Sequence, residues 1–184
     1  MIKNLVVSGC KPMELSIFNE ADHRISFVKK AIEKRLIQFI EEGLEWVLIS
    51  GQMGVELWTA EVVLDLKETY DINIAMIPPF ENMASRWPEA LQHKYEELSF
   101  SVDFYEPIYQ GDYRGPYQFR ARDEWLMDKS DACLLLMDEE YLGSVEYFYK
   151  VAKARDDYPV YFITPFDIDE VLREIQMQDP KYWE

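Results

Sequence analysis

The sequence predicts an α/β protein of three layers, in which helices cover both faces of a parallel sheet. Short apolar segments rich in β-branched residues alternate with amphipathic helical patterns along the chain, about six times in all. The short segments are almost continuously apolar, as is typical of strands that are covered on both faces. At 184 residues, the chain is long enough for one domain with a sizeable core, so residues 1–184 are expected to form a single unit.

Five apolar segments are predicted to be strands, because each ends in a turn that contains glycine, proline or an acidic residue. They are residues 4–8, 46–50, 72–77, 132–137 and 160–164. Residues 101–105 are a weaker sixth candidate, expected at an edge of the sheet. Helical patterns between consecutive strands imply parallel pairing through right-handed crossovers.

Helical spacing of apolar residues predicts the connecting elements. The first helix is expected from Asp22 to Glu42, where Gly43 suits the left-handed position that ends a helix. Pro88 interrupts the third pattern, so that helix is expected to break into two pieces or to start late. The other patterns lie at about 53–66, 82–98, 117–129, 144–156 and 167–176, the last within a C-terminal helix and tail at about 166–184.

The formal net charge of −16 is unevenly distributed. Residues 1–60 carry seven basic and eight acidic side chains, whereas the other 124 residues carry twelve and twenty-seven. Such a field repels the phosphate backbone of nucleic acids at long range, so nucleic acid is not an expected partner. A single small anion held by local backbone N–H groups remains compatible with this charge.

Metal and membrane sites are not expected. Cys10 and Cys133 are far apart, and neither histidine, His23 or His93, stands at a metal-ligand spacing. Both cysteines are expected to be reduced and buried in a cytoplasmic protein. The chain has no run of eighteen apolar residues, and its apolar N-terminal segment reads as a first strand rather than a signal peptide.

The carboxyl ends of the strands are the expected ligand-binding rim, as in other open α/β sheets. Gly9 and Ser50 end two strands there, and Gly51 and Gly54 would allow the backbone to approach a ligand closely. The helix that follows would point unpaired N–H groups at an anion such as phosphate. The alternative is a glycine turn that packs this helix on its strand, since the segment lacks the dinucleotide and P-loop glycine patterns.

A second loop could contribute to the same rim. Gly143 and Ser144 precede a helix, and Ser144 could both cap that helix and bind an anion. Three arginines form a small basic island in an acidic part of the chain: Arg114, Arg120 and Arg122. Arg122 is the main candidate to neutralise a ligand's charge, with Arg120 beside it. Alternatively, these arginines pair with nearby acidic side chains.

Four aromatic residues near the rim are candidates for stacking on a nucleobase: Phe80, Trp87, Tyr113 and Tyr117. Packing in the core or on the surface is the alternative. Residues 106–116 form the longest irregular segment, which suits a loop ordered by ligand binding. The same segment could instead pack its tyrosines over one end of the sheet.

Several short segments occur in a characteristic order along the chain: "VVSG", "LISGQMGVELWTAE", "MIPPF", "RDEWLMDKSD", "CLLLMD" and the "GS" that opens a later helix. With these segments in this order, the chain resembles the SLOG superfamily, and most closely its YpsA/YoqJ-like branch of small bacterial proteins. The resemblance extends from Val6 to about Thr164. It implies a Rossmann-like fold that binds a nucleotide or a nucleotide-derived, ADP-ribose-like ligand, with residues 50–54 and 143–144 in contact with its phosphate.

Two sequence motifs of the superfamily differ in this chain or are missing from it, and each difference disfavours one function known in the superfamily. The DNA-processing protein DprA and its relatives have an Arg-Asn-Arg stretch where this chain has Arg-Asp-Glu at 122–124, which disfavours DNA binding. LOG-type phosphoribohydrolases carry a Pro-Gly-Gly-x-Gly-Thr-x-x-Glu loop with a catalytic glutamate, and this chain has no such loop. Glu56, Glu61 and Glu146 are weaker candidates for a general acid or base, or simply favour the start of a helix.

Three functional hypotheses follow. The first is a cytoplasmic protein that binds a nucleotide-class small molecule and acts as a sensor. The second is a nucleotide N-glycosidase that uses one of these glutamates. The third is a protein-interaction module whose acidic face docks a basic partner while its pocket is vestigial. A homodimer through exposed helix faces is compatible with each of them.

Overall fold

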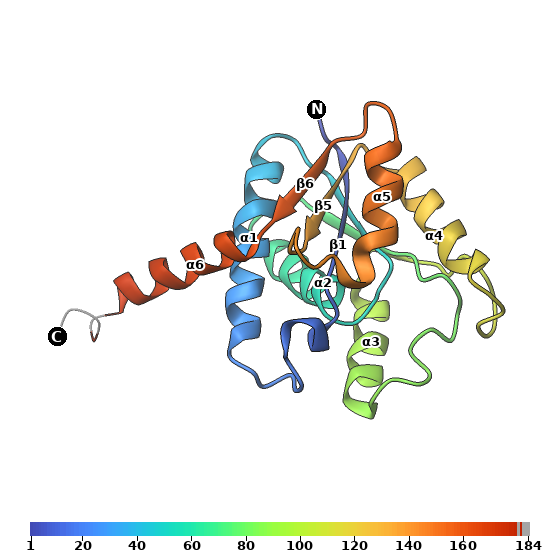
Figure 1. The fold of residues 1–184 in the computed structure, drawn as a ribbon, viewed down its shortest axis with the longest axis horizontal. Coiled ribbons are helices and arrows are strands. Elements are labelled where there is room, and N and C mark those ends of the chain that lie inside the picture. Colours follow the sequence, from blue (N-terminus) through green and yellow to red (C-terminus); the bar gives the residue numbers. More distant parts are fainter. Residues whose placement is uncertain (180, 182–184) are drawn as a thin grey trace.

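The computed structural model describes residues 1–179 and 181, and it confirms the α/β fold with a parallel sheet (Figure 1). Within these residues the sheet contains six strands in the order β4-β3-β2-β1-β5-β6, and every adjacent pair is parallel. The strands are β1 (Asn4–Gly9), β2 (Trp46–Ile49), β3 (Asn73–Met76), β4 (Phe104–Tyr105), β5 (Ala132–Leu136) and β6 (Val160–Ile163). The short β4 confirms the weaker sixth candidate at the sheet edge.

Helices connect the strands as expected. The described residues form α1 (Arg24–Glu41), α2 (Val55–Leu66), α3 (Glu89–Ser101), α4 (Tyr117–Asp128), α5 (Glu146–Ala154) and α6 (Pro165–Gln178). Two short 3-10 helices, η1 (Pro12–Leu15) and η2 (Gly143–Val145), follow β1 and precede α5. Helix α3 starts directly after Pro88, so the late start is correct. Residues 180 and 182–184 of the predicted tail lie outside the described residues.

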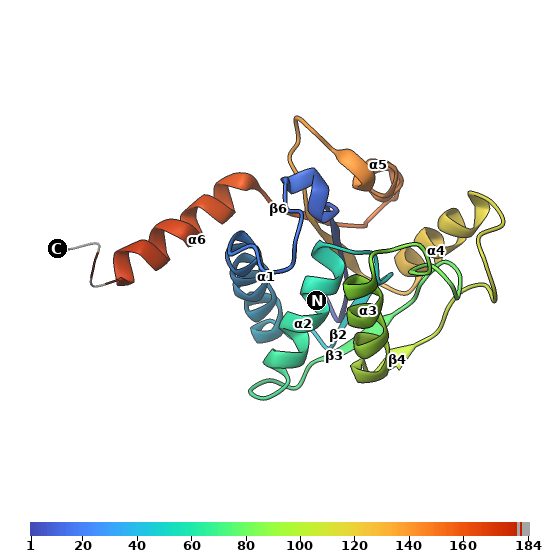
Figure 2. The same ribbon diagram turned by 90° about the horizontal axis from the view of Figure 1, so that it is seen from below.

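Two apolar clusters fill the space on either side of the sheet. Neighbouring strand residues point to opposite faces, so Leu5 and Val7 join one cluster while Val6 joins the other. Helices α1, α2 and α3 bury their apolar sides in the first cluster, and α4 and α5 bury theirs in the second. Helix α6 contacts α1 and then extends away from the body of the protein (Figures 1 and 2).

The strand order places a switch point between β1 and β5. From β1 the chain proceeds outward through β2, β3 and β4, and then returns to the other side of β1 to form β5 and β6. Gly9 at the end of β1 pairs with Leu136 at the end of β5. Connections leave these two strands in opposite directions, which opens a crevice at their carboxyl ends.

The segment 106–116 is tied to the residues that follow β3. Ile108 N donates to Pro78 O at 2.9 Å, and Glu81 N donates to Tyr109 O at 3.0 Å. These backbone hydrogen bonds continue the parallel pairing beyond β4 and fix the course of the segment. Within the described part of the chain, no helix has the length and apolarity needed to cross a membrane.

Candidate functional site

A cavity of about 310 Å³ lies at the carboxyl end of β1, in the predicted crevice. Its walls come from the end of β1, the loop after β2, the first turn of α2, one side of α4 and the segment that opens α5. Ligand sites in proteins commonly measure about 300–1,000 Å³, so the cavity suits a small molecule. Six of the predicted site residues line it: Gly9, Ser50, Glu56, Arg120, Arg122 and Ser144.

The loop after β2 binds a carboxylate of the protein itself. Glu56 Oε1 accepts hydrogen bonds from Ser50 N (2.7 Å), Ser50 Oγ (2.6 Å) and Gly51 N (3.2 Å). Its Oε2 accepts a hydrogen bond from Ser8 Oγ at 3.2 Å. Glu56 is only 6% exposed. The N–H groups of Ser50 and Gly51 therefore already have an anionic partner, and Glu56 brings a buried carboxylate to the cavity wall.

Gly51 and Gly54 face the protein interior. Their φ angles are +93° and +91°, a conformation that other residues rarely adopt. A Cβ on Gly54 would lie 2.5 Å from Cys10 O, and one on Gly51 would lie 2.6 Å from Met76 Cε. Gly54 therefore lets this loop approach the segment after β1, and Gly51 lets it approach the end of β3. A bulky residue at either position would disturb the fold, so it is no clean test of ligand binding.

The loop before α5 also binds a carboxylate of the protein. Ser144 N donates to Glu14 Oε1 at 2.9 Å, and Ser144 Oγ donates to Glu14 Oε2 at 3.1 Å. Glu14 Oε2 also accepts from Lys11 N at 3.0 Å. Gly143 lies against the same carboxylate, since a Cβ there would be 3.0 Å from Glu14 Cδ. Glu14 thus connects the segment after β1 to the loop before α5.

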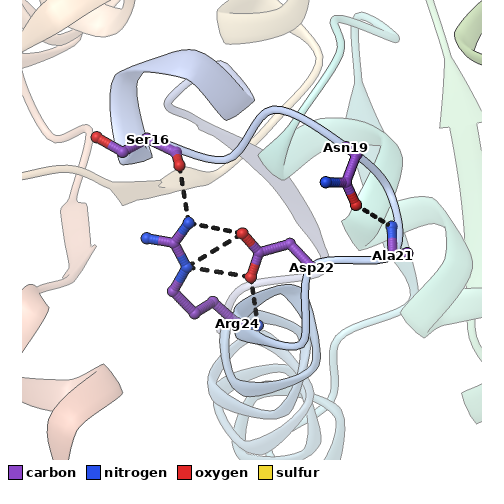
Figure 3. A network of polar contacts seen from close by, with 5 residues as sticks. All are labelled: Ser16, Asn19, Ala21, Asp22 and Arg24. Atoms are coloured by element: carbon purple, nitrogen blue, oxygen red, sulfur yellow. Dashed lines mark hydrogen bonds and ion pairs between the residues drawn. The ribbon is translucent and has the colours of Figure 1, made fainter.

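A polar network holds the segment that carries Glu14 (Figure 3). Arg24 Nη2 donates to Ser16 O at 2.7 Å, and Arg24 Nε donates to Asp22 Oδ1 at 3.0 Å. Asp22 Oδ1 also accepts from Arg24 N, and Asn19 Oδ1 accepts from Ala21 N, both at 2.9 Å. Hydrogen bonds from Arg24 lower the pKa of Asp22 to about 2.

Helix α4 contributes charged side chains of both signs. Arg120 and Arg122 line the cavity, and Arg122 Nε contacts Asp123 Oδ1 at 2.9 Å. This pairing is the alternative foreseen for the arginines, although Asp123 is 3% exposed rather than on the surface. Burial raises the pKa of Asp123, the positive charge of Arg122 opposes that shift, and the nearby Glu56 adds to it. The guanidinium of Arg122 also lies 5.3 Å from the centre of the Phe119 ring.

Two of the candidate glutamates lie outside this cavity. Glu61 Oε2 accepts from Lys29 Nζ at 3.0 Å, and its Oε1 lies 3.2 Å from Lys94 Nζ. Glu146 pairs with Lys150 at 2.8 Å on the exposed side of α5. Among the three glutamates proposed as an acid or base, Glu56 is the one that lines the cavity.

The candidate stacking residues gather at a second cavity. Phe80, Trp87 and Tyr113 line it, together with part of α4. Tyr117 lines neither cavity and packs edge-on against Tyr109, with the ring centres 5.4 Å apart. The structure thus brings three of the four aromatic candidates together.

The sequence analysis missed several cavity residues. Phe119, Asp123 and Leu126 line the cavity from one face of α4. Their spacing of three to four residues within a helical pattern was the available signal. Lys11 belongs to a segment without a recognisable pattern, and Tyr147 and Phe148 come from the start of α5, whereas Gln52 lies within the predicted loop at 50–54.

The fold and the cavity together define a Rossmann-like α/β protein with a polar crevice at the switch point of its sheet. The chain belongs to the YpsA family: the family model described as "YspA SLOG family" matches residues 5–168. The chain is 62% identical to a UPF0398 protein of Oceanobacillus iheyensis over 184 residues, which cover all of both chains. It is 43% identical over 177 residues to the UPF0398 protein YpsA of Bacillus subtilis, covering 94% of this chain and 98% of that one.

Proposed function

We propose that the protein binds a nucleotide or nucleotide-derived small molecule in the cavity at the end of β1. The observation that carries this proposal is the position of the cavity at the switch point, with side chains of both charges around it. Membership of the SLOG family supports a nucleotide-related role.

The charges of the cavity give the ligand an orientation. Lys11, Arg120 and Arg122 offer cationic groups to a phosphate. Glu56 and Asp123 repel a phosphate but can accept hydrogen bonds from sugar hydroxyls. The phosphate would therefore lie toward the basic side chains, and the sugar toward the buried carboxylates.

The proposed role is that of a sensor in the cytoplasm, and the state of the two cysteines supports the location. Cys10 and Cys133 are both free and buried, as in proteins of reducing compartments. Lys11 in the segment after β1 and Ser144 in the loop before α5 both line the cavity, which gives a sensor two segments that a ligand could rearrange. Exposed helix faces leave room for a homodimer.

A nucleotide N-glycosidase is the second candidate function, because Glu56 places a carboxylate on the cavity wall. The glutamate would act as the general acid or base at the glycosidic bond. Four hydrogen bonds, from Ser8, Ser50 and Gly51, hold this carboxylate in place at the cavity wall. Release of free base from a bound nucleotide, measured by chromatography for wild type and Glu56→Gln, distinguishes an enzyme from a binding protein.

A thermal-shift screen of the full chain against nucleotides, dinucleotides and ADP-ribose tests the proposal. A ligand at a hundredfold excess over its Kd adds about 2.7 kcal/mol to the unfolding free energy. For a chain of this size, that corresponds to a rise in Tm of roughly 5–11 °C. Arg120→Gln is expected to weaken a phosphate ligand about tenfold, through loss of one charge-assisted hydrogen bond.

Arg173→Gln in α6 is the matched control, because it removes the same charge far from the cavity. Equal weakening by both variants would mean that net charge, and not the cavity, governs affinity. Absence of any shift across the panel would contradict the proposal and favour the acidic interaction module. That module would capture a basic partner in a strongly salt-dependent manner.

A further inference from the structure

A second cavity, of about 530 Å³, lies between the loop after β3 and the start of α4. Phe119 lines both this cavity and the one at the end of β1, so the two share a wall. The first cavity has five charged side chains and three aromatic rings in its wall, whereas the smaller set of residues around the second has two charged side chains and four aromatic rings. The two cavities thus offer different chemistry to adjacent parts of one molecule.

Three aromatic rings form a cluster at this shared wall. The centres of Phe80, Tyr113 and Phe119 lie 5.7–5.9 Å apart in each pairing. Tyr113 is 52% exposed and therefore keeps much of its ring available. Trp87 is oriented by an edge-on contact with Tyr95, with the ring centres 5.5 Å apart. Flat aromatic faces of this kind suit another flat ring.

Hydrogen bonds hold the two sides of the cavity in place. Asn82 N donates to Gly111 O at 3.1 Å, and Asn82 Nδ2 donates to Asp112 Oδ1 at 2.7 Å. The fully buried Gln118 accepts from Arg114 N at 2.7 Å and donates to Asp112 O at 3.3 Å. The aromatic walls are therefore fixed before a ligand arrives, which lowers the entropic cost of binding a rigid ring.

Polar groups around the rings can form hydrogen bonds with the donors and acceptors on the edge of a heterocycle. Asp112 lines the cavity with a carboxylate, which accepts hydrogen bonds from ring N–H or amino groups. Arg86 lines the same cavity, and its guanidinium forms no hydrogen bond or ion pair within residues 1–179 and 181. The guanidinium of Arg86 can donate hydrogen bonds to a ring nitrogen or a carbonyl oxygen of the same heterocycle.

We propose that the second cavity binds the heterocyclic base of the ligand whose sugar phosphate lies in the first cavity. The protein would therefore select base-containing nucleotides over sugar phosphates. This inference rests on the proposed function, because it assigns a binding site to the base of the same ligand whose sugar phosphate occupies the first cavity. Phe119 borders both cavities: its ring contacts Arg122, which lines the first cavity, and Phe80 and Tyr113, which line the second.

The test compares AMP, GMP, CMP, UMP and ADP-ribose with ribose 5-phosphate, by calorimetric titration of the full chain. Stacking of one base on aromatic side chains contributes enough for the preferred nucleotide to bind about 5- to 150-fold more tightly than ribose 5-phosphate. Tyr113→Ala is expected to weaken the nucleotide about fivefold and leave ribose 5-phosphate unchanged. Tyr113→Phe keeps the ring and is expected to restore the affinity.

Phe100→Ala is the matched control, since Phe100 is 81% exposed on α3 and lines neither cavity. Equal affinity for nucleotides and ribose 5-phosphate would overturn the inference and leave the proposed function standing. Equal weakening of both ligands by Tyr113→Ala would also overturn it. Failure of every nucleotide and of ribose 5-phosphate to bind would overturn both proposals together.

Discussion

The Ser-Gly loop after β2 and the Gly-Ser loop before α5 bind different carboxylates in a similar way. In each loop the N–H and the hydroxyl of a serine both donate hydrogen bonds to a glutamate of this chain. Glu56 belongs to the helix that its own loop opens, six residues after Ser50, and is buried. Glu14 comes from a segment 130 residues before Ser144, and its contacts are exposed.

This difference in burial implies that one carboxylate is held permanently by its serine donors, whereas the other can be displaced from them. When a carboxylate is removed from buried donors, no water replaces it as the acceptor. The loss in unfolding free energy is therefore much larger than for the same change at the surface. An exposed carboxylate can instead be replaced by water or by another anion. We therefore expect Glu56 to be a fixed part of the cavity wall and Glu14 to be replaceable by a ligand phosphate.

The largest expected effect comes from Glu56→Ala. The substitution leaves the hydroxyl and N–H of Ser50 and the N–H of Gly51 without their shared acceptor, at a cost of about 3 kcal/mol in unfolding free energy. Urea unfolding of both proteins measures this change. Glu146→Ala, which removes an exposed glutamate from α5, is the control and should change stability by less than about 0.5 kcal/mol. If Glu56→Ala lowered the unfolding free energy by less than about 1 kcal/mol, the two loops would not differ in how firmly they hold their carboxylates.

Glu14→Gln is expected to have a smaller effect on stability and the opposite effect on binding. The loss of exposed charge-assisted hydrogen bonds should cost roughly 0.5–1 kcal/mol. Removing the negative charge near Ser144 should strengthen binding of inorganic phosphate or AMP several-fold, since like charges no longer oppose each other. Titration calorimetry measures the affinity, with Glu20→Gln as a control on the same segment. Unchanged or weaker phosphate binding would show that Glu14 does not compete with the ligand.

The smallest expected effect concerns Asp22, which fixes the segment that carries Glu14. Its pKa is lowered to about 2 in the folded protein, so the folded state binds this proton less readily than the unfolded state. The stabilisation is complete above about pH 4 and is lost as the pH falls toward 2. The Tm difference between wild type and Asp22→Asn should therefore shrink over that window. Asp65→Asn on α2 is the control, and a difference independent of pH would contradict the assignment.

The periodicity of hydrophobic residues predicted the strands and helices correctly, because the buried face of each element is visible in its own short stretch of sequence. The continuous apolar runs at 4–8 and 132–137 correspond to β1 and β5, which are covered on both faces. Pro88 also marked the start of α3 correctly, since proline lacks the N–H that a helix interior needs. The order of the strands was not predicted, because nothing local specifies which strand lies beside β1.

The candidate site was foreseen in part. Ser50 and Ser144 were identified as donors and Glu56 as a carboxylate near the rim, and all three line the cavity. What the sequence did not indicate is that Glu56 occupies the donors of Ser50. That contact depends on the side-chain direction in the first turn of α2, which periodicity does not describe.

The sequence by itself determined the class of fold, the rim where the loops gather and most of the polar residues there. These properties follow from hydrophobic periodicity and from the special conformations of glycine and proline, which act over a few residues. Only the tertiary structure decided that Glu14 reaches Ser144 and that Phe119 separates two cavities. Such contacts join segments far apart in the chain, and their geometry is set by how the helices pack on the finished sheet.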